Sequence, residues 1–290
     1  MIKFENVSKV FKKNRVLDST DLEIQLGERI ALVGSNGAGK TTLIRCLLGE
    51  YTHDGSVTVE GQAPRQNRAQ VLQKIGFVPQ LPPPLKMPVG QLINFASKVC
   101  NSERSRMVGI ASRLGLDVAK VEHLPFNKLS GGMKQKLLIA IAMGRDSKIL
   151  VMDEPAANLD PEARHIFFQL LAERQDNTTM LISSHRLDEV ASLVNRVLEL
   201  DRGKVVLDDR VADDATLSGL LACRLTLRRP EAAIAKTLAS WKFTDAGNGT
   251  EWEGMVAGAD RLRFLGMLSR YVGVLTQISL NEVAAGGGQL

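Results

Sequence analysis

One glycine-rich stretch of the chain carries residue types that bind phosphate groups. It reads Gly34-Ser35-Asn36-Gly37-Ala38-Gly39-Lys40-Thr41-Thr42, between apolar runs at 30–33 and 43–48. These flanks predict a strand before the loop and a helix after it, with backbone N–H groups and the positive end of the helix dipole facing a phosphate. At this spacing we expect Lys40 to reach the β- and γ-phosphates and Thr41 to ligate Mg²⁺. The stretch therefore predicts a nucleoside-triphosphate site, because a dinucleotide fingerprint would need a glycine in place of Asn36.

Two adjacent carboxylates, Asp153 and Glu154, follow a second apolar run at 149–152. Ligands of α/β sheets bind outside the carboxyl ends of the strands, so both side chains are expected to face the nucleotide. Asp153 is suited to hold Mg²⁺, usually through a water, and Glu154 to polarise the water that attacks the γ-phosphate. The pair predicts hydrolysis of the bound nucleotide.

A third motif begins a helix. Leu129-Ser130-Gly131-Gly132-Met133 precedes a helical run at 134–143, so Ser130 can cap the helix while the two glycines leave backbone donors uncovered. A second anion-binding helix start requires either a second phosphate or one phosphate held from two sides. The residues alone also allow an ordinary helix cap.

Together, six motifs resemble the ATP-binding subunit of ABC transporters, and the resemblance covers residues 1 to about 212. They are Gly34 to Thr42, Gln80, Leu129 to Met133, Ile149 to Glu154, Asn158-Leu159-Asp160 and His185. The resemblance implies a P-loop NTPase fold and an ATPase that uses ATP and Mg²⁺ to drive transport.

The resemblance also implies roles for single residues. Gln80 matches the glutamine that contacts Mg²⁺ and the attacking water, and His185 matches the switch histidine that holds the γ-phosphate and positions Glu154. With Lys40, these residues form the expected catalytic set. Phe11 stands where the family places an aromatic ring on adenine, although simple core packing is an equally good explanation for this side chain.

In this family two ATP-binding subunits pair head to tail. The resemblance implies that Ser130, Gly131 and Gly132 complete the γ-phosphate site of a second subunit, and that Asp160 spans the interface of the pair. Met133 replaces the usual glutamine of this motif, and Asn158 stands where a serine is common. Neither departure removes a group that hydrolysis needs, so we expect a competent ATPase and a homodimer.

The apolar pattern around the motifs predicts an α/β domain at 1–212. An antiparallel β layer is expected from short alternating segments, at 2–7, 21–26 and 55–60. Apolar runs at 149–152 and 178–182 are typical of strands buried on both faces of a parallel sheet. A strand that ends in a turn is expected at 75–80, and Leu81 and three prolines follow it. Spacings of three and four predict a helical insert at about 82–146.

The last part of the chain, residues 216–290, has a different pattern. It predicts a strand, a helix, a hairpin around Gly247-Asn248-Gly249, a second helix and a final strand. The order β-α-β-β-α-β matches the split βαβ arrangement. We therefore expect a small C-terminal accessory domain of the α+β, ferredoxin-like class.

Charge, cysteine content and apolar run length limit the classes of partner and the compartment that we expect for this chain. The formal net charge is +5, of which residues 216–290 contribute eight Lys/Arg against six Asp/Glu, so no concentrated basic stripe predicts nucleic-acid binding. Three widely spaced cysteines predict neither a disulfide framework nor a zinc site, and a reducing compartment is expected. No apolar run approaches the roughly 18 residues that span a bilayer. Together with this pattern, the resemblance to ABC transporter subunits implies a peripheral protein on the cytoplasmic face of the inner (cell) membrane, bound to a separate polytopic permease.

The segment Leu85 to Phe95 resembles the part of such subunits that receives the permease. The layout as a whole most resembles ATPases of the export-type ABC-2 group, including those of the transporters that mature nitrous oxide reductase. Two alternatives remain open. One is an importer ATPase whose C-terminal domain senses a small effector, and the other is a soluble ABC ATPase that has no role in transport.

Overall fold

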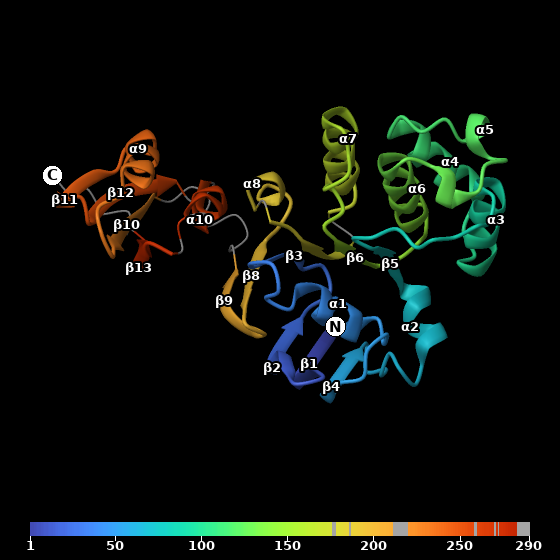
Figure 1. The fold of residues 1–290 in the computed structure, drawn as a ribbon, viewed down its shortest axis with the longest axis horizontal. Helices are drawn as coiled ribbons and strands as arrows, with labels where there is room; N and C mark the ends of the chain where they lie inside the picture. Colours follow the sequence, from blue (N-terminus) through green and yellow to red (C-terminus); the bar gives the residue numbers. More distant parts are fainter. Residues whose placement is uncertain are drawn as a thin grey trace, which may run out of the picture. The chain divides into compact units, whose positions relative to one another are not determined.

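The computed structural model describes residues 1–175, 178–185, 187–210, 220–257, 260–269, 271 and 273–282. The chain forms two compact units, one of Met1–His185 with Arg196–Asp209 and the other of Arg186–Asn195 with Arg210–Leu290 (Figure 1). The expected boundary between residues 212 and 216 lies outside the described residues.

An antiparallel sheet begins the first unit. Its strands are β1 (Ile2–Phe11), β2 (Asn14–Ile24) and β4 (Asp54–Val59), in the order β2-β1-β4. Ile2, Phe4 and Val7 are buried, whereas residues between them face outward, as expected for a sheet covered on one side. This confirms the antiparallel layer that the alternating segments predict.

A six-stranded sheet carries the ends at which the chemical motifs lie. Its order is β5-β6-β7-β3-β8-β9. The strands are β3 (Arg29–Val33), β5 (Ile75–Val78), β6 (Ile149–Asp153), β7 (Thr179–Ser183), β8 (Arg196–Asp201) and β9 (Lys204–Arg210). The pairs β5/β6, β6/β7, β7/β3 and β3/β8 are parallel. Because β6, β7 and β3 are neighbours, the residues after their carboxyl ends meet at one edge.

Helix α1 (Lys40–Leu47) packs between the two sheets. Its Leu43, Ile44 and Leu47 are fully buried in one core cluster with side chains of β1, β2, β3 and β6. The helix start, where the glycine-rich loop ends, is therefore held by apolar contacts on both sides.

A helical insert has a core of its own. It consists of α3 (Val89–Val99), α4 (Arg104–Arg113), α5 (Val118–Val121), a 3₁₀ turn (Phe126–Lys128) and α6 (Gly131–Met143). Apolar side chains of these helices form a separate buried cluster, as the spacings of three and four predict. Two further helices of this unit, α2 (Arg68–Lys74) and α7 (Pro161–Ala172), lie outside the insert.

The second unit contains α8 (Leu187–Val190) and a sheet of four antiparallel strands in the order β11-β12-β10-β13. Its elements are β10 (Leu220–Leu227), α9 (Ala232–Ser240), β11 (Thr244–Gly247), β12 (Glu251–Ala257), α10 (Arg261–Ser269) and β13 (Leu275–Glu282). Side chains of both α9 and α10, including Ile234 and Phe264, join the buried cluster of this unit. The order of elements from β10 onward is the one that the apolar pattern predicts.

A buried arginine fastens the amino end of β8. Arg196 is 2% exposed, its Nη1 donates to Glu28 Oε2 and to Glu23 O, and its Nε and Nη2 donate to both carboxylate oxygens of Asp208, all at 2.7 Å. We expect Arg196→Ala to lower the free energy of unfolding by about 2–3 kcal/mol, because it removes the charged hydrogen bonds that the buried guanidinium donates to Glu28, Asp208 and Glu23 O. Denaturant unfolding measures this loss. Arg113→Ala, which breaks an exposed pair with Glu173, is the control and should cost less than about 1 kcal/mol; an equal loss in both variants would contradict the prediction.

Candidate functional site

The glycine-rich loop joins β3 to α1 in a conformation that favours glycine at three positions. Gly34, Gly37 and Gly39 have φ angles of 142°, 84° and 112°. A Cβ atom on Gly34 would lie 2.2 Å from Leu200 O, so the backbone of the loop and that of β8 are in direct contact. The loop is therefore held against the sheet by positions that admit no side chain.

Lys40 reaches back over this loop from the first residue of α1. Its side chain is buried, and Nζ donates to Gly34 O at 2.6 Å and to Ser35 O at 3.2 Å. Burial lowers the pKa of Lys40, while the negative charges of Glu154 and Asp153 oppose this shift. A cation thus stands at the loop centre, close to two carboxylates.

A hollow of about 180 Å³ lies at the glycine-rich loop, and another of about 320 Å³ lies in the second unit. The loop hollow is lined by Val16, Gln80, Glu154 and Ser35 to Thr42. The structure thus brings together the loop and two residues, Gln80 and Glu154, that are distant from it in sequence. Exposed loop backbone, one lysine and the Thr41 hydroxyl are the donors and ligand that a triphosphate and Mg²⁺ require.

A serine of the neighbouring strand bonds both acidic residues at the end of β6, the carboxylate of Asp153 and the backbone of Glu154. Ser183 Oγ donates to Asp153 Oδ1 at 2.6 Å, and Glu154 N donates to the same Oγ at 2.9 Å. Glu154 has a φ of 48°, an uncommon angle for a residue with a side chain. This turn gives the two neighbours different surroundings: Asp153 is almost fully buried, while Glu154 lines the loop hollow.

His185 Nε2 lies in direct contact with Glu154 Oε1. Both residues follow carboxyl ends of adjacent strands, β7 and β6. Glu154 Oε1 thus has a ring nitrogen as partner, which orients a carboxylate that can accept a proton from water.

Ser130 is the N-cap of α6, and its Oγ accepts a hydrogen bond from Met133 N at 3.2 Å. Ser130 and Gly131 are exposed, and a Cβ on Gly131 would meet no atom within 4 Å. Ser130 is not among the residues that line the loop hollow of its own chain. The second anion-binding helix start therefore faces open space.

Asp160 is the N-cap of α7, where Oδ1 accepts from Ala163 N at 2.9 Å. Its Oδ2 lies 2.7 Å from Lys136 Nζ, and this pair holds the pKa of the Asp160 carboxyl below its usual value. Asp160 is exposed and remains a carboxylate at neutral pH.

Phe11 lies at the end of β1 and is half-exposed, but it does not line the loop hollow. Its ring meets Tyr51 edge to face at 5.2 Å between centroids, and Lys9 Nζ lies 4.8 Å from its centroid. The remaining exposed ring surface is available for stacking.

Three residues of this region were not predicted from the sequence. Val16 lines the hollow from β2, Ser183 bonds both carboxylate residues, and Gln135 is buried against Pro155. Ser183 had a usable signal, since a hydroxyl residue ends the strand that precedes His185. Val16 and Gln135 follow only from tertiary packing.

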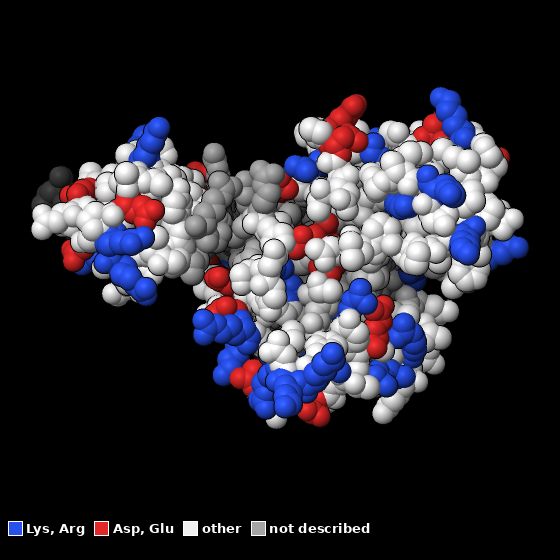
Figure 2. Space-filling model, viewed as in Figure 1, with Lys and Arg blue, Asp and Glu red and all other residues white. Residues whose placement is uncertain are grey.

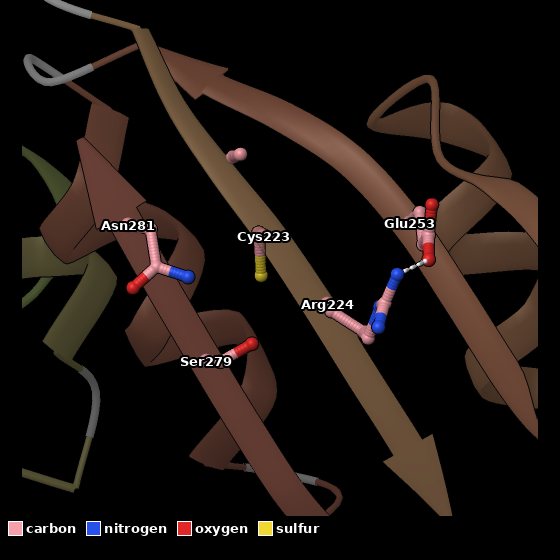
Figure 3. A pocket seen from close by; sticks show the side chains of 6 residues that line it. Cys223, Arg224, Glu253, Ser279 and Asn281 are labelled. Atoms are coloured by element: carbon pink, nitrogen blue, oxygen red, sulfur yellow. Dashed lines mark ion pairs between the residues drawn. The ribbon is translucent and has the colours of Figure 1, made fainter. Parts of the chain in front are cut away.

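The larger hollow lies on the side of the four-stranded sheet away from the core of the second unit (Figure 3). It forms over the small side chain of Ala222, which the strand register places between Met255 and Asn281. Arg224 and Glu253 pair with each other there and are exposed, and burial raises the pKa of the Cys223 thiol to about 12. The lining has no buried polar group aimed into it, so it resembles an ordinary solvated sheet face.

Figure 2 shows Lys and Arg interspersed with Asp and Glu over the visible faces of both units. Of the expected permease-binding segment, Val89 and Leu92 are buried in the core of the insert, whereas Met87 and Phe95 are exposed. Leu81 and Val99, just outside it, are exposed as well. Within the described ranges, no helix has the length and apolarity needed to cross a bilayer.

Comparisons with known proteins agree on the family. The family model described as ABC transporter matches residues 17–157. The chain is 32% identical to the Nod factor export ATP-binding protein I of Rhizobium etli, over 77% of this chain and 72% of that protein. It is 31% identical to the glutamine transport ATP-binding protein GlnQ of Escherichia coli, over 72% of this chain and 90% of that one.

The fold agrees with solved structures. A dimeric ATP-binding cassette in a post-hydrolysis state, bound to ADP and Pi, superposes with a TM-score of 0.64 at 24% identity, over 73% of this chain and 99% of that one. An ATP-binding subunit of an ABC transporter superposes with a TM-score of 0.67 at 22% identity, over 72% of this chain and 90% of that one. With its P-loop NTPase fold and these relatives, the chain belongs to the ABC transporter family, as an ATP-binding subunit and an ATPase.

Proposed function

We propose that the chain drives transport through a separate permease by hydrolysing ATP in sites that two copies of the chain share, head to tail. The observation that carries this proposal is that the two phosphate-binding helix starts of one chain do not lie at the same hollow. The loop hollow contains Lys40, Gln80 and Glu154, whereas the exposed Ser130 loop, a second phosphate-binding helix start, lies outside it. A second copy of the chain can bring the two together.

In each site the backbone of Ser35 to Thr42 and the Lys40 ammonium hold the phosphates of ATP, with Phe11 against the adenine. Thr41, Gln80 and Asp153 hold Mg²⁺ through oxygen atoms and water, as this ion prefers. When bound, Mg²⁺ neutralises charge on the β- and γ-phosphate oxygens. No three His, Cys, Asp or Glu side chains of the described ranges cluster as a metal site, which fits an ion held largely by phosphates and water.

Glu154 accepts the proton of the attacking water. His185 orients the Glu154 carboxylate through the contact between Nε2 and Oε1. Gln80 contacts the same water and Mg²⁺. Ser130 Oγ with the backbone N–H groups of Gly131 and Gly132 then binds the γ-phosphate of the partner's ATP, and Asp160 lies at the interface of the two copies.

Mixing two inactive chains tests the shared site. A Lys40→Met chain lacks the phosphate-binding cation, and a Ser130→Asp chain keeps a good helix cap but places a carboxylate against the γ-phosphate. We expect each chain alone to hydrolyse ATP at about 1% of the wild-type rate or less. A one-to-one mixture should regain at least tenfold, because half of the sites in mixed pairs contain neither change. A mixture no faster than the separate chains would exclude the shared arrangement.

We further propose that the ATP-binding domain spans 1–212 and that residues 216–290 form a ferredoxin-like accessory domain, supported by its strand order β11-β12-β10-β13. The chain would lie on the cytoplasmic face of the inner (cell) membrane and contact its permease through Met87, Phe95 and neighbouring exposed apolar residues.

Export is the direction we propose, supported by the likeness to the Nod factor export protein and by the layout of the C-terminal domain, similar to those of ABC-2 ATPases, including those of nitrous oxide reductase maturation. Import with effector sensing is the second candidate, because the likeness to GlnQ is equally strong. A small molecule that changes hydrolysis through residues 216–290 would favour import. A C-terminal domain that is insensitive to effectors and only dimerises would favour export.

A further inference from the structure

The first turns of α6, directly after the Ser130 loop, are fastened to the segment that follows Glu154. Gln135 is fully buried, and its Nε2 donates to Pro155 O at 2.9 Å. Lys136, with a side chain that is 14% exposed, holds Asp160 through the 2.7 Å pair. Two consecutive residues of the helix thus bind the two ends of the segment 155–160.

This segment is continuous with the catalytic carboxylate. Pro155 is the next residue after Glu154, whose backbone N–H is in turn bound to Ser183 Oγ. The backbone is also close at Gly132, where a Cβ would lie 3.2 Å from Asn158 O. The Ser130 loop and Glu154 of one chain are therefore joined by short polar contacts rather than by a flexible connection.

Stability does not explain the amide of Gln135. Its Oε1 is buried and has no hydrogen-bond partner among the residues that the structure describes. A buried acceptor left unpaired costs about 1–3 kcal/mol, which offsets the similar cost that leucine would bring by leaving Pro155 O without its donor, so the amide gives little net stability. The amide instead supplies a directed hold on the carbonyl next to Glu154.

We infer that Gln135 and Lys136 are positioning residues that couple the Ser130 loop of each chain to its own Glu154. This inference rests on the shared sites proposed above, in which Glu154 acts on the ATP of its own chain and Ser130 on that of the partner. When the Ser130 loop of one chain closes on the partner's ATP, Gln135 and Lys136 then position Glu154 of the same chain at its own ATP.

The first test uses the full chain without mixing. We expect Gln135→Leu to lower kcat at least about tenfold, because small misplacements of reacting groups are costly. The Kd for a fluorescent ATP analogue should not rise, and the thermal midpoint should not fall. Lys136→Met should lower kcat in the same way, Lys136→Arg should restore most of it, and Lys134→Met, on the same helix, is the control. An unchanged kcat, or a kcat that falls only together with the thermal midpoint, would overturn the inference.

The second test places Gln135→Leu in one chain of the complementing mixture at a time. The productive site takes Glu154 from the Ser130→Asp chain and Ser130 from the Lys40→Met chain. Coupling predicts a loss of about tenfold or more in either placement, because each chain contributes one end of its own link to the productive site. A loss only in the chain that supplies Ser130 would reduce Gln135 to a local support of the loop and overturn the coupling. Failure of the mixture before Gln135→Leu is added would instead refute the shared sites.

Discussion

Glu154→Gln is expected to lower ATP hydrolysis by about 10²–10⁴-fold while ATP still binds. Glutamine keeps the size of the side chain but cannot accept a proton from water, whereas Lys40 and the loop that hold the phosphates are unchanged. Because the lost interaction matters mostly in the transition state, kcat should fall far more than the affinity for ATP. Phosphate release at saturating ATP and equilibrium binding of a labelled analogue measure the two quantities.

The same variant should accumulate as an ATP-bound dimer, since the site can close but cannot turn over. Size-exclusion chromatography with ATP and Mg²⁺ measures this directly. Glu162→Gln, an exposed carboxylate in the first turn of α7, is the matched control and should behave as the wild type. Full hydrolysis by Glu154→Gln without trapped dimers would show that another group acts as the base.

Gly34→Ala is expected to destabilise the phosphate-binding loop by about 3–5 kcal/mol, from overpacking together with backbone strain. The added Cβ would lie 2.2 Å from Leu200 O, and a backbone oxygen of a buried strand cannot move aside cheaply. Binding of ATP should weaken by at least about 100-fold, because the loop must leave its position against β8.

Gly37→Ala separates the two causes. Gly37 has a φ of 84° but no atom within 4 Å of its Cβ position, so this variant introduces backbone strain without a steric clash. It should lose only about 1–2 kcal/mol. Equal losses of thermal stability and ATP binding in the two variants would contradict the importance of the contact with Leu200.

Much of the candidate site could be predicted from the sequence because its motifs depend on interactions between residues that are close together in the chain. The glycine-rich loop, the cap at Ser130 and the carboxylates after an apolar run each depend on residues within a few positions of one another. The continuous apolar runs of β6 and β7 likewise identify strands that are buried on both faces.

What could not be predicted depends on packing between distant segments. Ser183 reaches Asp153 across 30 positions, and Gln135 reaches Pro155 across 20. The apolar spacing in 85–95 identifies a helix but not which side chains are exposed, so the burial of Val89 and Leu92 had to come from the structure. Arg196 contacts Glu28 and Asp208 only because the pairing of strands in the sheet brings these residues together.

The most direct test of the transport role is purification of the tagged chain from gently solubilised membranes, with Phe95→Asp as its matched control. Phe95 is 57% exposed, so the added charge should leave the fold and the ATPase activity of the free chain unchanged. We predict a polytopic membrane protein at equal stoichiometry with the wild-type chain and its loss with Phe95→Asp. Recovery of ribosomes or DNA with the wild-type chain, and of no membrane protein, would contradict a transporter subunit while leaving the ATPase intact.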